Sequence, residues 1–358
     1  MTESTSPWAI VNDSFKVFES FLWAFEIVCV LYVINCFRKA SLLHYNLKII
    51  LINFSLAMIV YAFSRLGMHI DAIFLSYGIG PVNITCRSSL LVPKILSAVA
   101  IVVAVCCFMM LTVERTVATF IPKKYEQLRK TRKELLLSLL LWVASIGVSL
   151  GLNLSPEGPI IECDKAVPNA SVFLLGLNAE FVLVMVAVGN VSTAANVALL
   201  YMLHKHNKKR RNQLNPGQLN IRYQYTENIL TTRFLTMAIG LTFVTVVIGL
   251  LLVSFYYYAQ RTNLVKSGDL LFVEQCFHAL AAAYGVSFNV VCLIMHRPNK
   301  DQLMRDIRKI SCFQTKTYVE ELLSPKIKSV DGHSLIFKNE SAMYFKYLSD
   351  QWNATRAK

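Results

Sequence analysis

The sequence predicts an all-α membrane protein, a seven-transmembrane helix bundle with its N-terminus outside the cell and its C-terminus in the cytoplasm. Three observations predict this fold class: an apolar composition, seven apolar runs of membrane-crossing length, and basic residues concentrated in alternate connecting segments. Of the 358 residues, 55% are hydrophobic and 16% are charged, whereas a soluble chain carries about 25% charged residues. The net charge of +14 could also suit nucleic acid, but the basic residues lie between apolar runs. Composition therefore favours a polytopic membrane protein.

The apolar runs define the expected spans. The third contains nineteen uncharged residues, 95–113, which as a helix cover about 28 Å, close to the thickness of bilayer hydrocarbon. The uncharged parts of the last four runs are 22, 23, 27 and 21 residues long, enough for a crossing each. Glu19 and Glu26 interrupt the first run. The alternation typical of a β-barrel is missing, so helices must satisfy the backbone. The expected spans are 17–37, 47–67, 90–113, 135–156, 174–203, 234–260 and 270–296.

Lysine and arginine predict the orientation. Segments 38–48, 115–134 and 204–233, together with the stretch from residue 297 onward, carry 29 of the 36 basic residues. By the positive-inside rule these segments face the cytoplasm, which leaves residues 1–16 outside. That arrangement requires an odd number of crossings, and seven satisfies it.

Three segments outside the spans have their own patterns. In 297–312, apolar positions recur every three or four residues among basic ones, which predicts an amphipathic helix on the inner membrane surface. Cys312 at its end is a candidate for palmitoylation. Residues 313–358 are polar and are expected to form a cytoplasmic tail. The basic segment 207–218, which contains a Pro-Gly pair, is expected to be a cytoplasmic loop.

Cysteines and glycosylation motifs give a weaker test of sidedness. The nine cysteines show no metal-ligand spacing, so no metal site is expected. Cys86 and Cys163 both fall on the expected outer, oxidising side, where a disulfide is favoured over two unpaired thiols. Asn12, Asn83 and Asn169 begin glycosylation motifs on that side. Two further motifs in the expected cytoplasmic tail show that chance matches occur.

The pair Glu114-Arg115 stands where the third span meets the cytoplasm. As a functional element, Arg115 would be a switch, held by a carboxylate at rest and then released to a cytoplasmic partner. The alternative is an ordinary pair at a helix end that reaches the headgroups. The dipeptide alone does not decide between them.

Polar residues in the outer halves of the spans are candidates for a ligand pocket, because ionisable groups at membrane depth usually face the bundle interior. Glu274 and His278 are four residues apart and share a helix face. The alternative places Lys94 and Glu274 among headgroups. Glu26 is expected to pair with a pocket residue. The pocket candidates are Lys94, Asn178, Glu180, Glu274 and His278.

Signatures of enzymes are missing from the sequence. It contains no HExxH, GxSxG or P-loop motif, so neither catalysis nor a cofactor is expected. The span 270–296 has no lysine to which a retinal Schiff base could attach. A conduction pathway would need repeated carboxylates facing one lumen, and the scattered glutamates do not supply them.

Several short stretches make the chain resemble the nematode serpentine chemoreceptors, most closely their epsilon (Sre) class, whose motifs are partly shared by the alpha and beta classes. These stretches occur in the expected order and on the expected side. They are Leu43-His44-Tyr45-Asn46-Leu47, Glu114-Arg115-Thr116-Val117-Ala118-Thr119, Tyr125-Glu126, Arg222-Tyr223-Gln224 and Glu227-Asn228.

The resemblance implies a G-protein-coupled receptor that detects environmental chemicals in sensory neurons, at the ciliary part of the plasma membrane. Its partners would be an extracellular small molecule and a heterotrimeric G protein. The residues implied in coupling are Glu114, Arg115, Tyr125, Glu126, Arg222 and Tyr223. Compared with rhodopsin-like receptors, Trp142 resembles the tryptophan of the fourth span, and Cys86 and Cys163 resemble their disulfide.

This chain also departs from the rhodopsin-like pattern. Thr116 replaces the usual aromatic residue, the sixth span has no proline, and Asn289 is not followed by proline. Details of rhodopsin-like activation therefore do not transfer. The rival function is a seven-helix ligand-gated channel or transporter. A tag at Thr2 would show on which side of the membrane the N-terminus lies. Staining of intact cells favours the receptor, and staining only after permeabilisation favours the channel.

Overall fold

In the computed structural model, the described residues are 7–40, 43–76, 88–121, 132–153, 179–214, 219–262 and 267–310, and within them every regular element is a helix. The long helices are α1 (Pro7–Lys39), α2 (Tyr45–Ser76), α3 (Ser88–Phe120), α5 (Arg132–Asn153), α6 (Ala179–Gln213), α7 (Leu219–Thr262) and α8 (Ser267–Met295). A shorter helix, α9 (Arg297–Ile310), follows the bend at His296.

The lengths and apolar content of these helices fit a membrane. Among the described residues, six helices are long and apolar enough to cross one, and the apolar part of α5, Leu136–Gly151, is shorter. Each expected span overlaps one of the seven long helices. Together with the absence of strands from the described residues, this is the architecture of an all-α membrane bundle.

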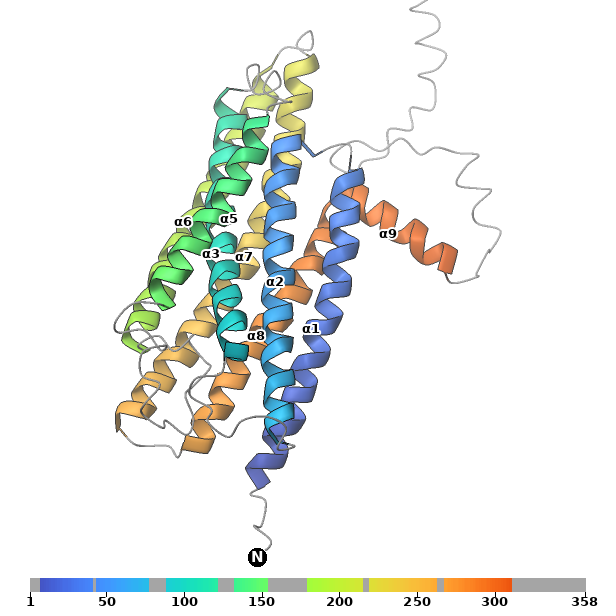
Figure 1. Cartoon of the computed structure of the whole chain (residues 1–358). Helices are drawn as coiled ribbons and strands as arrows, with labels where there is room; N and C mark the ends of the chain where they lie inside the picture. Colours follow the sequence, from blue (N-terminus) through green and yellow to red (C-terminus); the bar gives the residue numbers. More distant parts are fainter. Residues whose placement is uncertain are drawn as a thin grey trace, which may run out of the picture. The chain divides into compact units, whose positions relative to one another are not determined.

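Helices α1, α2, α3, α5, α6, α7 and α8 run side by side as a bundle (Figure 1). Helix α3 is central, because it packs against α2, α5, α6 and α7. Helix α1 packs against α2 and α8, and α7 packs against α6 and α8. The chain divides into one unit of residues Met1–Leu303 and a second, Met304–Lys358, of which only the last turns of α9 are described.

Aromatic and amide side chains join the middle of the bundle. The Phe54 ring of α2 lies 4.8 Å from Phe108 of α3 and 4.6 Å from Phe288 of α8, measured between ring centroids. Trp142 of α5 donates its indole N–H to Asn53 Oδ1 at 2.9 Å. These contacts fix α2 against three neighbours, and large apolar side chains face outward, as a lipid environment requires.

The structure corrects the expected loop at 207–218. Helix α6 continues to Gln213 and α7 begins at Leu219, so at most a short connection separates them. Lysine, arginine and glutamine are good helix formers, and the helix therefore continues beyond its apolar run. The Pro216-Gly217 pair lies outside the described residues.

Candidate functional site

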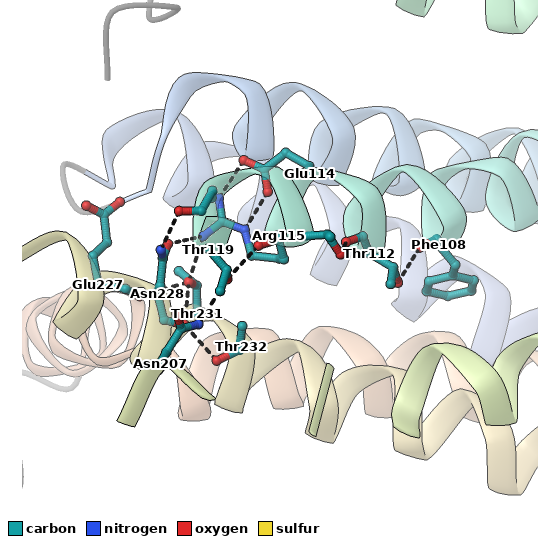
Figure 2. Close-up of polar contacts among 12 residues, drawn as sticks. Phe108, Thr112, Glu114, Arg115, Thr119, Asn207, Glu227, Asn228, Thr231 and Thr232 are labelled. Atoms are coloured by element: carbon teal, nitrogen blue, oxygen red, sulfur yellow. Dashed lines mark hydrogen bonds and ion pairs between the residues drawn. The ribbon is translucent and has the colours of Figure 1, made fainter. Parts of the chain in front are cut away.

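One buried polar network surrounds Arg115 in α3. The Arg115 side chain is 1% exposed and Glu114 is 9% exposed. The guanidinium donates Nε–H to Glu114 Oε2 and Nη2–H to Glu114 Oε1, the latter at 2.5 Å (Figure 2). This is a two-point pairing, in which the planar guanidinium matches both carboxylate oxygens.

Helix α7 supplies the other acceptors for Arg115. Nη1 donates to Thr231 Oγ1 at 2.8 Å and to Asn228 Oδ1 at 3.3 Å. The Asn228 amide in turn donates to the Ala118 carbonyl of α3 at 3.0 Å. Asn228 and Thr231 are three residues apart and therefore share a helix face. Arg115 thus ties α3 to α7 directly.

Helix α6 joins the same network through Asn207. Its amide donates to Thr119 Oγ1 at 3.1 Å, and the Thr119 hydroxyl donates to the Arg115 carbonyl at 2.8 Å. Figure 2 shows these side chains converging from α3, α6 and α7. Three helices are therefore held together at one end of the bundle by polar contacts that water does not reach.

The structure places the other residues implied in coupling differently. Arg222 and Tyr223 lie near the start of α7 and are exposed, one to two turns before Asn228 and outside the Arg115 network. Tyr125 and Glu126 lie outside the described residues. Sequence reasoning singled out Arg115 but not Asn207 or Thr231, because their role depends on the packing of three helices.

A second buried network surrounds Glu19 in α1, at the opposite end of the bundle. The Glu19 side chain is 0% exposed. It accepts hydrogen bonds at Oε1 from Trp23 Nε1 at 3.0 Å and from Arg65 Nη2 at 2.9 Å. The His69 Nε2 atom lies 3.1 Å from the same oxygen. We call these four residues of α1 and α2 the Glu19 network.

Three of the pocket candidates lie around this network. His278 of α8 is 3% exposed, and its Nδ1 lies 3.4 Å from the Tyr61 hydroxyl. Glu274 is 4% exposed and interacts electrostatically with Arg65 and with Lys94 of α3. The burial of Glu274 favours the bundle interior over the headgroup alternative. Helices α1, α2, α3 and α8 thus bring ionisable groups to one place.

Sequence reasoning missed Arg65 and His69, and it treated Glu19 only as an interruption of the first span. The available signal was spacing: Glu19 and Trp23, like Arg65 and His69, are four residues apart on their helices. That spacing indicates shared faces but not that the two faces meet.

Several expected sites fall where the structure gives no side-chain description. Cys86, Cys163, Asn83, Asn169, Asn178 and Cys312 lie outside the described residues, as does the tail 313–358. Asn12 lies in α1 and Glu180 in α6, but their side chains are outside the described set. Among the side chains that are described, no group of three or more His, Cys, Asp or Glu residues could hold a metal ion.

Comparison with known proteins gives two findings. A family model described as the serpentine type 7TM GPCR receptor class ab chemoreceptor matches residues 10–325. A Caenorhabditis elegans protein named Probable G-protein coupled receptor F27E5.8 is 23% identical over 375 residues, which cover 98% of this chain and 95% of that protein. The expected nematode chemoreceptor family is confirmed, whereas the epsilon class is not supported, because the matching model describes class ab. Short motifs shared between classes do not separate them.

Proposed function

The chain belongs to the serpentine class ab family of seven-transmembrane chemoreceptors, and from that premise we propose that it binds an extracellular small molecule within its helix bundle and activates a heterotrimeric G protein. It is a multi-pass membrane protein of the G-protein-coupled receptor type. In this proposal residues 1–16 lie outside, the Arg115 end of the bundle faces the cytoplasm, and the receptor works at the ciliary membrane of sensory neurons.

The observation that carries the proposal is the Arg115 network. A buried arginine with acceptors on two helices can hold α3 and α7 together and can be released only when the helices separate. The Glu114 contact lies within α3 itself, so it neutralises the guanidinium without resisting that separation. The contacts to Thr231 and Asn228 supply the resistance. Separation would offer Arg115 to a cytoplasmic partner, and the exposed Arg222 and Tyr223 lie one to two turns before Asn228 on α7.

The Glu19 network is the proposed ligand end. Its charged groups are buried between α1, α2 and α8, at the end of the bundle opposite the Arg115 network. A ligand can shift the receptor only if it binds one packing of the helices better than the other. The proposed pocket therefore includes Lys94, Glu274 and His278 together with Glu19 and Arg65.

Replacing Arg115 tests the switch. We expect Arg115→Ala to abolish ligand-evoked G-protein activation while the receptor still reaches the cell surface, because the alanine cannot engage the G protein. Arg261→Ala is the control, since Arg261 is exposed at the other end of α7 and donates to Tyr257 within the same helix. Both variants would be compared at equal surface expression in cells that express a promiscuous G protein.

Three outcomes bear on this proposal. Loss of the response in Arg115→Ala with a normal response in the control supports it. A full response from Arg115→Ala at matched expression contradicts the switch role. Ligand-evoked current in cells without any G protein would favour the channel instead.

A further inference from the structure

Glu26 is a buried acid that the Glu19 network does not use. It lies seven residues after Glu19, two turns along the same face of α1, and its side chain is 0% exposed. Neither carboxylate oxygen has a hydrogen-bond partner among the described residues. The expected pairing of Glu26 with a pocket residue is thus not seen in the described part of the chain.

Helix α8 makes room for this carboxyl group at Gly285. A Cβ atom at position 285 would overlap the Glu26 carboxyl, so the acid lies against the α8 backbone where a side chain would otherwise stand. Gly285 follows His278 by seven residues and therefore lies on the same face of α8. The face of α1 that carries Glu19 and Glu26 packs against the face of α8 that carries His278 and Gly285.

The cations described at this end of the bundle are engaged by groups other than Glu26, or lie away from it. The buried acids are Glu19, Glu26 and Glu274, and the cations packed among them are Arg65 and Lys94, with Lys16 ten residues before Glu26 along α1. Arg65 is bound to Glu19, and Lys94 interacts with Glu274. His69 lies next to Glu19, and His278 lies next to Tyr61. Glu26 is left without a cation among these groups, and a buried carboxylate without one is strongly disfavoured.

The surroundings of Glu26 suit one kind of partner. Tyr284 of α8 directly precedes Gly285, against which the Glu26 carboxyl lies, and Trp23 precedes Glu26 by three residues on α1. Trp23 stands against Tyr61, with 5.2 Å between the ring centroids. A carboxylate among aromatic rings is the chemistry that recognises an ammonium group, by charge pairing and by cation–π contact.

We propose, resting on the receptor function proposed above, that the ligand is a small organic molecule with one positive charge and that Glu26 is the acid that pairs with it. Because Glu26 is inaccessible in this packing, the ammonium binds only when α1 and α8 move apart. The ligand therefore favours the separated packing, which is the differential affinity that a signal requires.

The test uses the full-length receptor in cells with a promiscuous G protein and a panel of matched triplets. Each triplet has one carbon skeleton carrying an ammonium, an alcohol or a carboxylate, such as 2-phenylethylamine, 2-phenylethanol and phenylacetate. The variants are Glu26→Gln, which removes the charge, and Glu26→Asp, which keeps it. Gly285→Ala is a third variant, since its methyl group displaces the carboxyl from its position.

We expect ammonium members to activate the wild type. Glu26→Gln should weaken their potency about ten- to hundredfold, as loss of a hydrogen bond to a charged group does. Glu26→Asp should keep the preference for ammonium, and Gly285→Ala should weaken it. Surface staining accompanies each measurement, and Gly285→Ala provides the readout if Glu26→Gln does not reach the surface.

Results that contradict the pairing of an ammonium ligand with Glu26 can be told apart from results that contradict the receptor function. Activation by alcohols or carboxylates in place of ammonium members would overturn the charge assignment and leave the receptor function standing. Silence of every ammonium member at normal surface expression, or ammonium potency unchanged in Glu26→Gln, would overturn it as well. A receptor with neither basal nor evoked G-protein activation contradicts the proposed function itself.

Discussion

Replacing Thr231 by valine tests whether the contact between α3 and α7 holds the receptor at rest. Valine has nearly the shape of threonine but lacks the hydroxyl, and Thr231 is 2% exposed. The substitution removes the acceptor that lies 2.8 Å from Arg115 Nη1 and leaves Glu114 in place. It therefore weakens the attachment to α7 without unpairing the buried charge.

The magnitude follows from the kind of hydrogen bond that is lost. Bonds to charged groups contribute about 1.5–3 kcal/mol in soluble proteins, and bonds between membrane helices about 0.6 kcal/mol on average with a maximum near 1.7. The second Nη1 acceptor, Asn228 at 3.3 Å, retains part of the interaction. A value of about 1.5 kcal/mol is reasonable and corresponds to about a tenfold shift towards the separated packing. A resting receptor that is about 1% active would become about 10% active.

Basal G-protein activation without ligand is the readout, measured at equal surface expression by a proximity signal between G-protein subunits. We expect Thr231→Val to raise it several-fold. Thr236→Val is the matched control: it removes the same hydroxyl from the same helix, where Thr236 donates to the Thr232 carbonyl at 2.7 Å, within α7. Equal basal activity in both variants, or a fall in Thr231→Val, would refute the reasoning that this bond holds the resting state.

Two further predictions concern stability, measured as the thermal unfolding midpoint of detergent-solubilised receptor. Asn53→Ala should lower it, because the partly buried Trp142 indole loses its acceptor at 2.9 Å, and an unpaired donor costs about 1–3 kcal/mol when it is fully buried; an unchanged midpoint would contradict this. Burial lowers the pKa of His296 below its ordinary value of 6.5, with Lys48 acting in the same direction and the hydrogen bond with Asn299 opposing it. The folded state therefore favours neutral His296, so its contribution is present above pH 6.5 and is lost as the pH falls below that value. His296→Gln should reduce the fall in midpoint between about pH 7.5 and 5.5, and an equal fall in both proteins would disprove it.

The sequence contained enough to predict the helices but not how their faces meet. Apolar runs of membrane length predict spans because the bilayer imposes both the length and the helical backbone. The end of α6 was mistaken for a loop, because basic helix formers continue a helix without any apolar pattern to mark it. Class ab could not be told from the epsilon class, since the motifs used were short and shared.

The candidate site shows the same division. Arg115 was identifiable because its acidic partner is adjacent in sequence and because the pair directly follows an uncharged run of membrane length. Glu19 was not, since its partner Arg65 is 46 residues away and the two meet only when α1 packs on α2. Thr231 gave no signal of its own, because a threonine in a helix usually bonds to its own backbone, as this one also does to the Glu227 carbonyl.

The four residues of the Glu19 network share no helix with the Arg115 network, and one route between the two ends of the bundle runs from α8 to α7. The Tyr284 hydroxyl of α8 lies 2.8 Å from Thr242 Oγ1 of α7, and Tyr284 is adjacent to the glycine that Glu26 contacts. Thr242 and Thr231 are eleven residues apart on one continuous helix, about three turns. Movement of α8 away from α1, as proposed for ligand binding, would therefore act on α7 through Thr242, three turns from the Arg115 contact. We infer that the bond between Arg115 and Thr231 is the contact that breaks when ligand binding at one end and G-protein binding at the other favour the separated packing. The pair of Arg115 with Glu114 cannot serve, because both residues move with α3, and a contact that is equal in both packings favours neither.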